Sequence, residues 1–293
     1  MTRNFRELLE ARWDESKFLC VGLDTDAQML PESVQKVSVR ETIVAFNRAI
    51  VDATKDIVCA YKPNSAFYEA HGDEGWSALR ETAQYILEQA PEVPIILDAK
   101  RADIGNSNNG YADSIFRHLH MDAVTVHPYL GGSALKPFLE QKDKGIFVLC
   151  RTSNGGAGEL QDLIVSNPST PIGKAQDTLP GVSEPLYKKV ARLVAEKWNT
   201  NNNCGVVVGA TYPDELKEVR AIVGDMPILI PGVGAQGGDV GEAAFAGKDS
   251  RGKGIIVTAS RSIIFASRGS DFADAARAQA EKLHQAILTS LTS

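Results

Sequence analysis

The sequence contains few cysteines and no cluster of them. Its 293 residues include only four, Cys20, Cys59, Cys150 and Cys204, and each lies within an apolar run. No two of these cysteines have the spacing of a metal site. We therefore expect buried, reduced thiols, which fit a reducing cytoplasm.

Long apolar segments are also missing. No run approaches the roughly 20 apolar residues that a membrane-spanning helix needs. The first residues, MTRNFRELLEARWDESK, are amphipathic and charged, without the apolar core of a signal peptide. We therefore expect a cytoplasmic protein that does not associate with membranes.

The sequence has no excess of positive charge. Its formal net charge is −6 and its pI is about 5.5, which argues against an extended nucleic-acid-binding surface. A small anionic ligand remains compatible with this balance, because a single local cluster of donors can bind it.

Short apolar runs rich in β-branched residues recur along the whole chain. They occupy residues 18–24, 57–64, 93–100, 123–129, 145–154, 204–210, 227–234 and 254–262. Continuous apolar strands of this kind are typical of a parallel sheet that is covered on both faces. With 43% hydrophobic residues, the chain can build one large core.

Amphipathic helical patterns lie between these runs. Residues 39–53 place Ile43, Phe46, Ile50 and Val51 on one face. Residues 183–198 do the same with Leu186, Val190, Leu193 and Val194, after a start at Ser183 and Glu184 that could cap the helix. Further helices are expected to begin near Ser107, Gly238 and Asp271.

Eight strand-plus-helix units predict a single (β/α)8 TIM barrel over residues 1–293, preceded by an N-terminal helix. The alternative is an open doubly wound sheet, but the first strand ends in GLDTDAQ, without the glycine-rich turn of that fold. The longest irregular stretch, 155–181, follows the fifth strand. Unstructured loops of that length are usually functional, so we consider it a candidate lid.

Charged residues gather where the predicted strands end, which is the catalytic face of this fold. Asp98 and Lys100 share one face of their strand because side chains alternate. Lys62 ends the neighbouring strand, and Asp103 lies just past the third one. An alternating lysine–aspartate array would satisfy the cost of desolvation and keep a lysine protonated, as a proton donor requires. The simpler alternative is an ion network that only fastens the barrel end.

The last two strands indicate a phosphate site. Glycines in PGVGAQGGD, residues 231–239, allow backbone N–H groups to approach an anion. Arg261 on the next strand offers a forked donor to phosphate oxygens. We therefore expect a small phosphorylated ligand whose reactive end lies near the second and third strands.

At this point the motifs resemble a known family. LDAKRADIGNS, together with VGLD, YKPNSAFYE, CRTSN, PGVGAQGGD and ASRSI, closely resembles orotidine 5′-phosphate decarboxylases. The chain length and the DAKRxDIG form look like the bacterial type 2 subfamily. The D-x-K-x-x-D element alone is shared with a wider group of sugar-phosphate enzymes, whereas its combination with Ser153, Gln236 and Arg261 is more specific.

The resemblance implies decarboxylation of orotidine 5′-phosphate to UMP, the last step of pyrimidine synthesis, without a metal or organic cofactor. It implies that Lys100 protonates C6 and that Asp98 lies against the substrate carboxylate. Lys62 would hold Asp98 and a ribose hydroxyl, and Asp24 would accept a hydrogen bond from the ribose.

The remaining binding roles also follow from the resemblance. Ser153 would contact the pyrimidine edge, Gln236 would bridge base and phosphate, and Arg261 would bind the phosphate. Further substrate-binding candidates are Asn64, which could instead support Lys62, and Pro231, Gly232 and Ser260. Asp103 and Ser107 would reach into the neighbouring subunit's site, which implies a homodimer. By strand parity Arg101 points outward, and His127 lines either the pocket or only the rim.

Three other functions remain open. A hexulose-phosphate synthase or keto-gulonate-phosphate decarboxylase would need a divalent metal ion. A Schiff-base aldolase would need a neutral lysine, whereas Asp98 and Asp103 favour the charged form. A non-catalytic nucleotide-binding barrel would typically lack one member of the charged array, and this chain has all four.

Overall fold

The computed structural model describes residues 3–166, 183–233 and 239–292. Eight parallel strands form one sheet in the order β2-β1-β10-β9-β8-β5-β4-β3. Two isolated bridges, Tyr61 to Ile95 and Asn64 to Asp98, join β2 to β3 and complete the ring. The predicted (β/α)8 barrel is therefore confirmed.

Each barrel strand coincides with one of the apolar runs in the sequence. The strands are β1 (Leu19–Leu23), β2 (Val58–Pro63), β3 (Ile96–Arg101), β4 (Ala123–Val126), β5 (Gly145–Arg151), β8 (Cys204–Val208), β9 (Ile228–Ile230) and β10 (Ile255–Ala259). Nearly all of their residues are buried, because helices cover the outside and side chains fill the interior. The four cysteines lie in this core as free, buried thiols.

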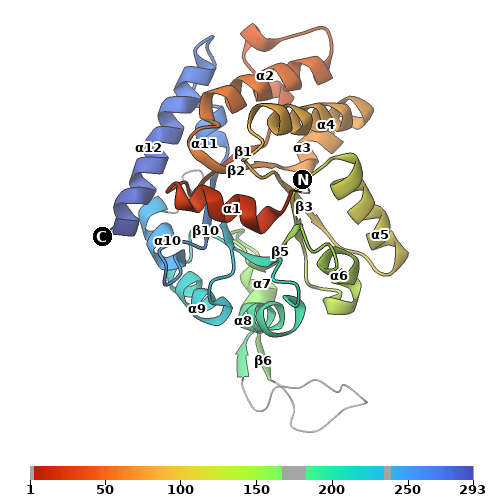
Figure 1. Ribbon diagram of the computed structural model, residues 1–293, viewed down its shortest axis with the longest axis vertical. Helices are drawn as coiled ribbons and strands as arrows, with labels where there is room; N and C mark the ends of the chain where they lie inside the picture. The colour runs from red at the N-terminus through yellow and green to blue at the C-terminus, as the bar shows by residue number, and fades with distance from the viewer. Residues whose placement is uncertain (1–2, 167–182, 234–238, 293) are drawn as a thin grey trace.

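Helices surround the barrel (Figure 1). They are α2 (Val39–Thr54), α3 (Ser65–Glu69), α4 (Gly72–Gln89), α5 (Asn106–Ala112), α6 (Gly131–Leu139), α8 (Leu186–Leu193), α9 (Pro213–Val223), α10 (Val240–Gly247), α11 (Arg261–Ile264) and α12 (Phe272–Thr292). Short 3-10 turns η1 (Ala27–Met29) and η2 (Glu32–Val34) follow β1, and the π-helical turns η3 (Asp113–His118) and η4 (Val194–Trp198) extend α5 and α8. Across the described residues, none of the helices combines the length and apolar character needed to cross a membrane.

The N-terminal helix α1 (Phe5–Asp14) closes one end of the barrel. The Phe5 ring packs edge-on against Phe147 of β5 at 5.6 Å between ring centroids. Trp13 Nε1 donates a hydrogen bond of 2.8 Å to the carbonyl oxygen of Ile255, the first residue of β10. The helix α1 therefore packs across the amino ends of these strands.

The expected helix at 39–53 is α2, and its four predicted core residues are buried. Ser38 caps it, because its hydroxyl accepts a hydrogen bond from the Glu41 N–H. The predicted cap at Ser183 and Glu184 was wrong. Those residues belong to a strand, and α8 begins at Leu186, directly after Pro185.

The stretch 155–181 is more regular than expected. It contains the short helix α7 (Gly158–Gln161) and the strand β6 (Ile164–Ser166), while residues 167–182 lie outside the described part of the chain. β6 pairs with β7 (Ser183–Pro185) in an antiparallel ribbon that projects from the barrel (Figure 1). This pairing explains the misplaced cap, because Glu184 is engaged opposite Val165 instead of starting a helix.

Candidate active site

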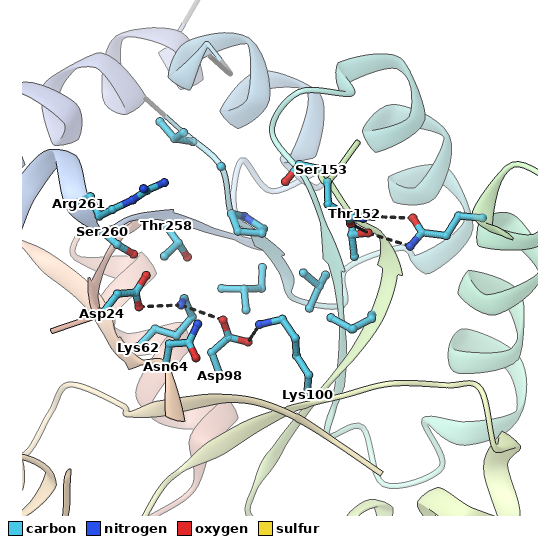
Figure 2. Close-up of a pocket in the computed structure, with 18 residues that line it drawn as sticks. Asp24, Lys62, Asn64, Asp98, Lys100, Thr152, Ser153, Thr258, Ser260 and Arg261 are labelled. Atoms are coloured by element: carbon cyan, nitrogen blue, oxygen red, sulfur yellow. Dashed lines mark hydrogen bonds and ion pairs between the residues drawn. The ribbon is translucent and has the colours of Figure 1, made fainter. Parts of the chain in front are cut away.

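A cavity of about 530 Å³ opens at the carboxyl ends of the barrel strands (Figure 2). It is lined by Asp24, Lys62, Asn64, Asp98, Lys100, Leu149, Thr152, Ser153, Asn154, Gln161, Val207, Leu229, Pro231, Gly232, Val233, Thr258, Ser260 and Arg261. Ten of the predicted site residues therefore meet in one pocket: Asp24, Lys62, Asn64, Asp98, Lys100, Ser153, Pro231, Gly232, Ser260 and Arg261.

Four charged residues form a row along this pocket, which we call the charged row: Asp24, Lys62, Asp98 and Lys100 (Figure 2). The Nζ atom of Lys62 lies 3.2 Å from Asp98 Oδ2 and 3.8 Å from Asp24 Oδ1. Lys100 Nζ lies 2.7 Å from Asp98 Oδ1. Asp98 thus bridges two cations, one from its own strand and one from the neighbouring strand.

Burial and charge act against each other on the charged row. Burial alone would raise the pKa of Asp98, but the charges of Lys62 and Lys100 outweigh it, and the net effect holds that pKa well below its usual value. Burial likewise would lower the pKa of Lys62, but Asp98 and Asp24 overcome it and raise the pKa. Both groups are therefore charged at neutral pH, although the Lys62 side chain is only 4% exposed.

The backbone at Lys100 is unusual. Its φ of 49° is left-handed, a conformation that costs a non-glycine residue about 1–3 kcal/mol. The ladder between β3 and β4 shifts its register here. Thr125 of β4 stabilises the arrangement, because its hydroxyl accepts a 3.0 Å hydrogen bond from the Lys100 N–H and donates a 2.8 Å one to Asp98 Oδ1. One threonine thus orients both ends of the Asp98–Lys100 pair.

Asp24 is held by a buried polar network behind it. The hydroxyl of the next residue, Thr25, donates to Asn47 Oδ1 at 2.6 Å, and Asn47 Nδ2 donates to the Tyr68 hydroxyl at 3.0 Å. Tyr68 in turn donates to the carbonyl oxygen of Leu23. Asp24 Oδ1 is buried without a hydrogen-bond donor among the described residues. The partner of this oxygen is the Lys62 ammonium group, 3.8 Å away.

The other part of the pocket, which we call the loop side, consists of Thr152, Ser153, Gly232, Ser260 and Arg261. These residues lie beyond the ends of β5, β9 and β10, and Figure 2 shows Ser153, Ser260 and Arg261 above the charged row. Arg261 is the first residue of α11 and is exposed. Among the described lining residues, its guanidinium is the cation on this side of the pocket.

Three predicted site residues are not part of this chain's described pocket. Asp103 and Ser107 lie between β3 and the first turn of α5, and Ser107 is exposed. Gln236 lies outside the described residues. Arg101 points away from the pocket, where it pairs with Glu69 and lies 5.4 Å from the centroid of the Tyr111 ring. His127 is not among the pocket-lining residues either.

Sequence reasoning missed several residues of the site. Thr258 could have been found, since it lies two positions before Ser260 in the extended run 254–262, where alternate residues share a face. Nothing in the local sequence around Thr125 or Gln161 predicts a role in the site. Each is linked to the site by a hydrogen bond to a residue of another element. Among the described residues, no three His, Cys, Asp or Glu side chains are grouped to hold a metal ion.

A parallel barrel with a charged pocket at the carboxyl ends of its strands defines an enzyme of the (β/α)8 class that acts on a small molecule. The model of the Orotidine 5'-phosphate decarboxylase / HUMPS family matches residues 17–278. The chain belongs to this family, as its motifs predicted.

Individual relatives agree over nearly the full length. The orotidine 5'-phosphate decarboxylase of Cellvibrio japonicus (strain Ueda107) is 46% identical over 285 residues, which are 97% of this chain and 98% of the relative. That of Roseiflexus castenholzii (strain DSM 13941 / HLO8) is 47% identical over 292 residues, 98% of each chain.

Solved structures share the fold. The OMP decarboxylase of Leishmania donovani is 34% identical with a TM-score of 0.78, and the match covers 97% of this chain and 99% of that one. The UMP synthase of Leishmania donovani is 36% identical with a TM-score of 0.80. That match covers 98% of this chain but 57% of the synthase, so the chain spans little more than half of that protein.

Proposed function

We propose that this protein decarboxylates orotidine 5′-phosphate to UMP, the last step of pyrimidine synthesis, with Lys100 as the proton donor. Support comes from the relatives named for this activity. The observation that carries the residue assignment is the charged row, in which Asp98 joins Lys62 and Lys100 at 3.2 and 2.7 Å. These ion pairs hold the ammonium groups of Lys62 and Lys100 beside one carboxylate, where a carbanion would form.

The pocket offers a binding mode with the phosphate and the reactive carbon at different parts of the site. Arg261, Ser260 and the backbone beside Pro231 and Gly232 bind the phosphate. The Asp24 carboxylate accepts a hydrogen bond from a ribose hydroxyl, and Lys62 contacts the same sugar, since both residues line the cavity. Ser153 hydrogen-bonds the pyrimidine edge, and Gln236 bridges base and phosphate. Asn64 lines the same wall, two residues after Lys62.

The chemical step needs one proton and no electron acceptor. The bond from C6 to the carboxylate breaks, carbon dioxide leaves, and the bonding electron pair stays on C6. The Lys100 ammonium delivers a proton to that carbon, and water later restores the proton to the amine. A pre-positioned cation stabilises the developing charge without reorganising at the moment of reaction.

Asp98 contributes an electrostatic repulsion that is present in the bound substrate and disappears during the reaction. Its carboxylate and that of the substrate are like charges, and at about 4 Å they repel by about 4 kcal/mol at an effective dielectric constant of 20. The repulsion disappears as carbon dioxide departs uncharged. The interaction therefore destabilises the bound substrate relative to the transition state, which lowers the barrier.

A spectrophotometric assay of orotidine 5′-phosphate loss tests this proposal directly. The reaction as written uses neither a metal ion nor an organic cofactor, so we expect full turnover of the purified protein in excess EDTA. No turnover of this substrate would refute the proposed function. Activity that EDTA abolishes and a divalent metal restores would favour the metal-dependent sugar-phosphate enzymes instead.

We further propose a homodimer with shared sites in the cytoplasm. Asp103 and Ser107 would complete the partner's charged row, since neither lines this chain's own pocket. Ile104, beside Asp103, is 65% exposed, and a partner subunit that reaches Asp103 would cover this apolar side chain.

Complementation between two inactive variants tests the sharing. Asp98→Ala and Asp103→Ala proteins, mixed and allowed to exchange subunits, should regain about a quarter of wild-type activity, because half of the molecules carry one intact site. Absence of recovery after exchange has been verified would show that each subunit uses its own Asp103.

A further inference from the structure

We propose that Gln161 is a positioning residue that holds the turn Thr152–Asn154 in the shape that recognises the base of the nucleotide. The inference rests on the proposed function, because it concerns how the same pocket selects a pyrimidine. Gln161 ends α7, in a segment outside the barrel strands, and its side chain lines the active-site cavity.

The amide of Gln161 binds Thr152 at two points. Gln161 Oε1 accepts a 2.8 Å hydrogen bond from the Thr152 N–H, and Gln161 Nε2 donates a 2.8 Å hydrogen bond to Thr152 Oγ1. These are the dashed lines at Thr152 in Figure 2. The Thr152 hydroxyl in turn donates to Asn154 Oδ1 at 2.7 Å. One side chain thereby fixes both the backbone and the side-chain rotamer at the start of the turn.

Gln161 is itself oriented by a buried arginine. Arg151, only 4% exposed, donates through Nη1 to Gln161 Oε1 at 3.3 Å and through Nη2 to Asp162 Oδ2 at 3.1 Å. Its guanidinium lies 4.1 Å from the centroid of the Tyr212 ring. This contact fastens the end of β5 and the end of α7 to the segment after β8. The Gln161 amide therefore has one orientation available to it.

Ser153 directly follows the residue that Gln161 anchors. β5 stops at Arg151, so Ser153 lies two residues past the end of its strand. On one side it packs against Gly209, where an added Cβ would lie 2.7 Å from the Ser153 Cβ. On the other side, the preceding residue is held by Gln161. Among the described residues, the side-chain hydrogen bonds of Gln161 go to Arg151 and Thr152, and none goes to α11, which carries Arg261.

Because, among the described residues, Gln161 hydrogen-bonds to the turn that carries Ser153 and not to the helix that carries Arg261, its loss should weaken binding of the base more than binding of the phosphate. Gln161→Met keeps the approximate length of the side chain and removes its hydrogen bonds. We expect the Kd for UMP to rise about tenfold, equivalent to about 1.4 kcal/mol, while the Kd for ribose 5-phosphate stays within about twofold. Glu159→Met on the same helix is the matched control, because Glu159 is exposed and does not line the cavity. It should change neither Kd.

Calorimetric titration of both ligands into the wild type and each variant measures these constants, with thermal unfolding to compare stability. Equal weakening of UMP and ribose 5-phosphate, or unchanged UMP binding, would overturn the inference. Such a result would leave the proposed function intact, since the wild type could decarboxylate orotidine 5′-phosphate and still bind UMP independently of residue 161.

A second variant keeps the test decisive if Gln161→Met folds poorly. Thr152→Val removes the hydroxyl that Gln161 contacts, and it should weaken UMP binding with the same selectivity. Thr152→Ser keeps that hydroxyl and should restore binding to near the wild-type value. The double variant Gln161→Met/Thr152→Val should be scarcely weaker than either single one, whereas additive losses would show that the two residues act independently.

Discussion

Asp98 and Ser153 both serve the pocket from the carboxyl side of a barrel strand, but they are held there by different means. Asp98 belongs to β3, bridges two lysines and accepts a hydrogen bond from Thr125 of the next strand. Ser153 lies two residues past the end of β5, on a turn that is anchored from outside the barrel. Three of the four residues of the charged row belong to strands of the sheet and Asp24 directly follows β1, whereas the loop side lies beyond the strand ends.

This difference separates two tasks. Groups within strands keep their geometry and charge without a ligand, which is what electrostatic stabilisation of a transition state requires. Groups on turns and at helix starts lie at the entrance of the pocket, where they contact the phosphate and the base as the substrate enters. Substitutions in the charged row should therefore lower the rate of the chemical step or the stability of the fold. Substitutions on the loop side should weaken substrate binding.

The largest expected effect is on the chemical step. Lys100→Met should lower kcat by at least about 10³-fold, because it removes the proposed general acid. The affinity for UMP should fall by less than about tenfold. Single-turnover assays and product titration measure the two quantities, with Lys136→Met on the surface of α6 as the control. A kcat within tenfold of the wild type would exclude Lys100 as the proton donor.

The next largest effect concerns stability. Asp98→Asn should destabilise the fold by about 3 kcal/mol at neutral pH, because Lys62 is left buried without its main partner. The folded-state pKa of Asp98 is lowered, so its stabilising contribution is present above its ordinary pKa of about 4 and is lost as the pH falls toward the folded value. Urea unfolding of both proteins between pH 7 and pH 3 should show their difference shrinking at the acid end. A difference that does not depend on pH would contradict the ionised state of Asp98.

A change on the loop side should affect binding. Arg261→Ala should raise KM by about 10- to 100-fold, the effect of losing hydrogen bonds to a charged phosphate. The melting temperature should stay near that of the wild type, since Arg261 is exposed. Arg268→Ala, another exposed arginine outside the cavity, is the control. A fall in kcat without a change in KM would place Arg261 in the chemical step.

The smallest effect is expected where β1, the strand that precedes Asp24, packs against Ser260 of the loop side. A Cβ added to Gly22 of β1 would lie 2.8 Å from the Cβ of Ser260, so Gly22→Ala should cost about 1–3 kcal/mol of stability through overpacking. Ser260→Gly in the same chain should recover most of that loss. Denaturant unfolding of the single and double variants measures this loss of unfolding free energy. Additive losses would indicate that the two residues do not clash sterically.

Much of the fold could be predicted from local pattern. Parallel strands buried on both faces produce continuous apolar runs, so all eight barrel strands were found. Side-chain alternation also predicted that Asp98 and Lys100 share a face. Ser183 was misinterpreted because an N-cap residue and a strand residue look alike in sequence. Its state is decided by pairing with Ser166, which lies 17 positions earlier.

The sequence by itself determined the strand order along the chain, the placement of charge at strand ends and the family to which the protein belongs. Only the tertiary structure decided that Thr125 bridges Asp98 to the Lys100 backbone, that Tyr68 and Asn47 support the segment carrying Asp24, and that Gln161 holds Thr152. The reason is physical. A strand's period follows from its own backbone, whereas a hydrogen bond between distant residues depends on closure of the barrel, which brings together side chains from different strands and helices.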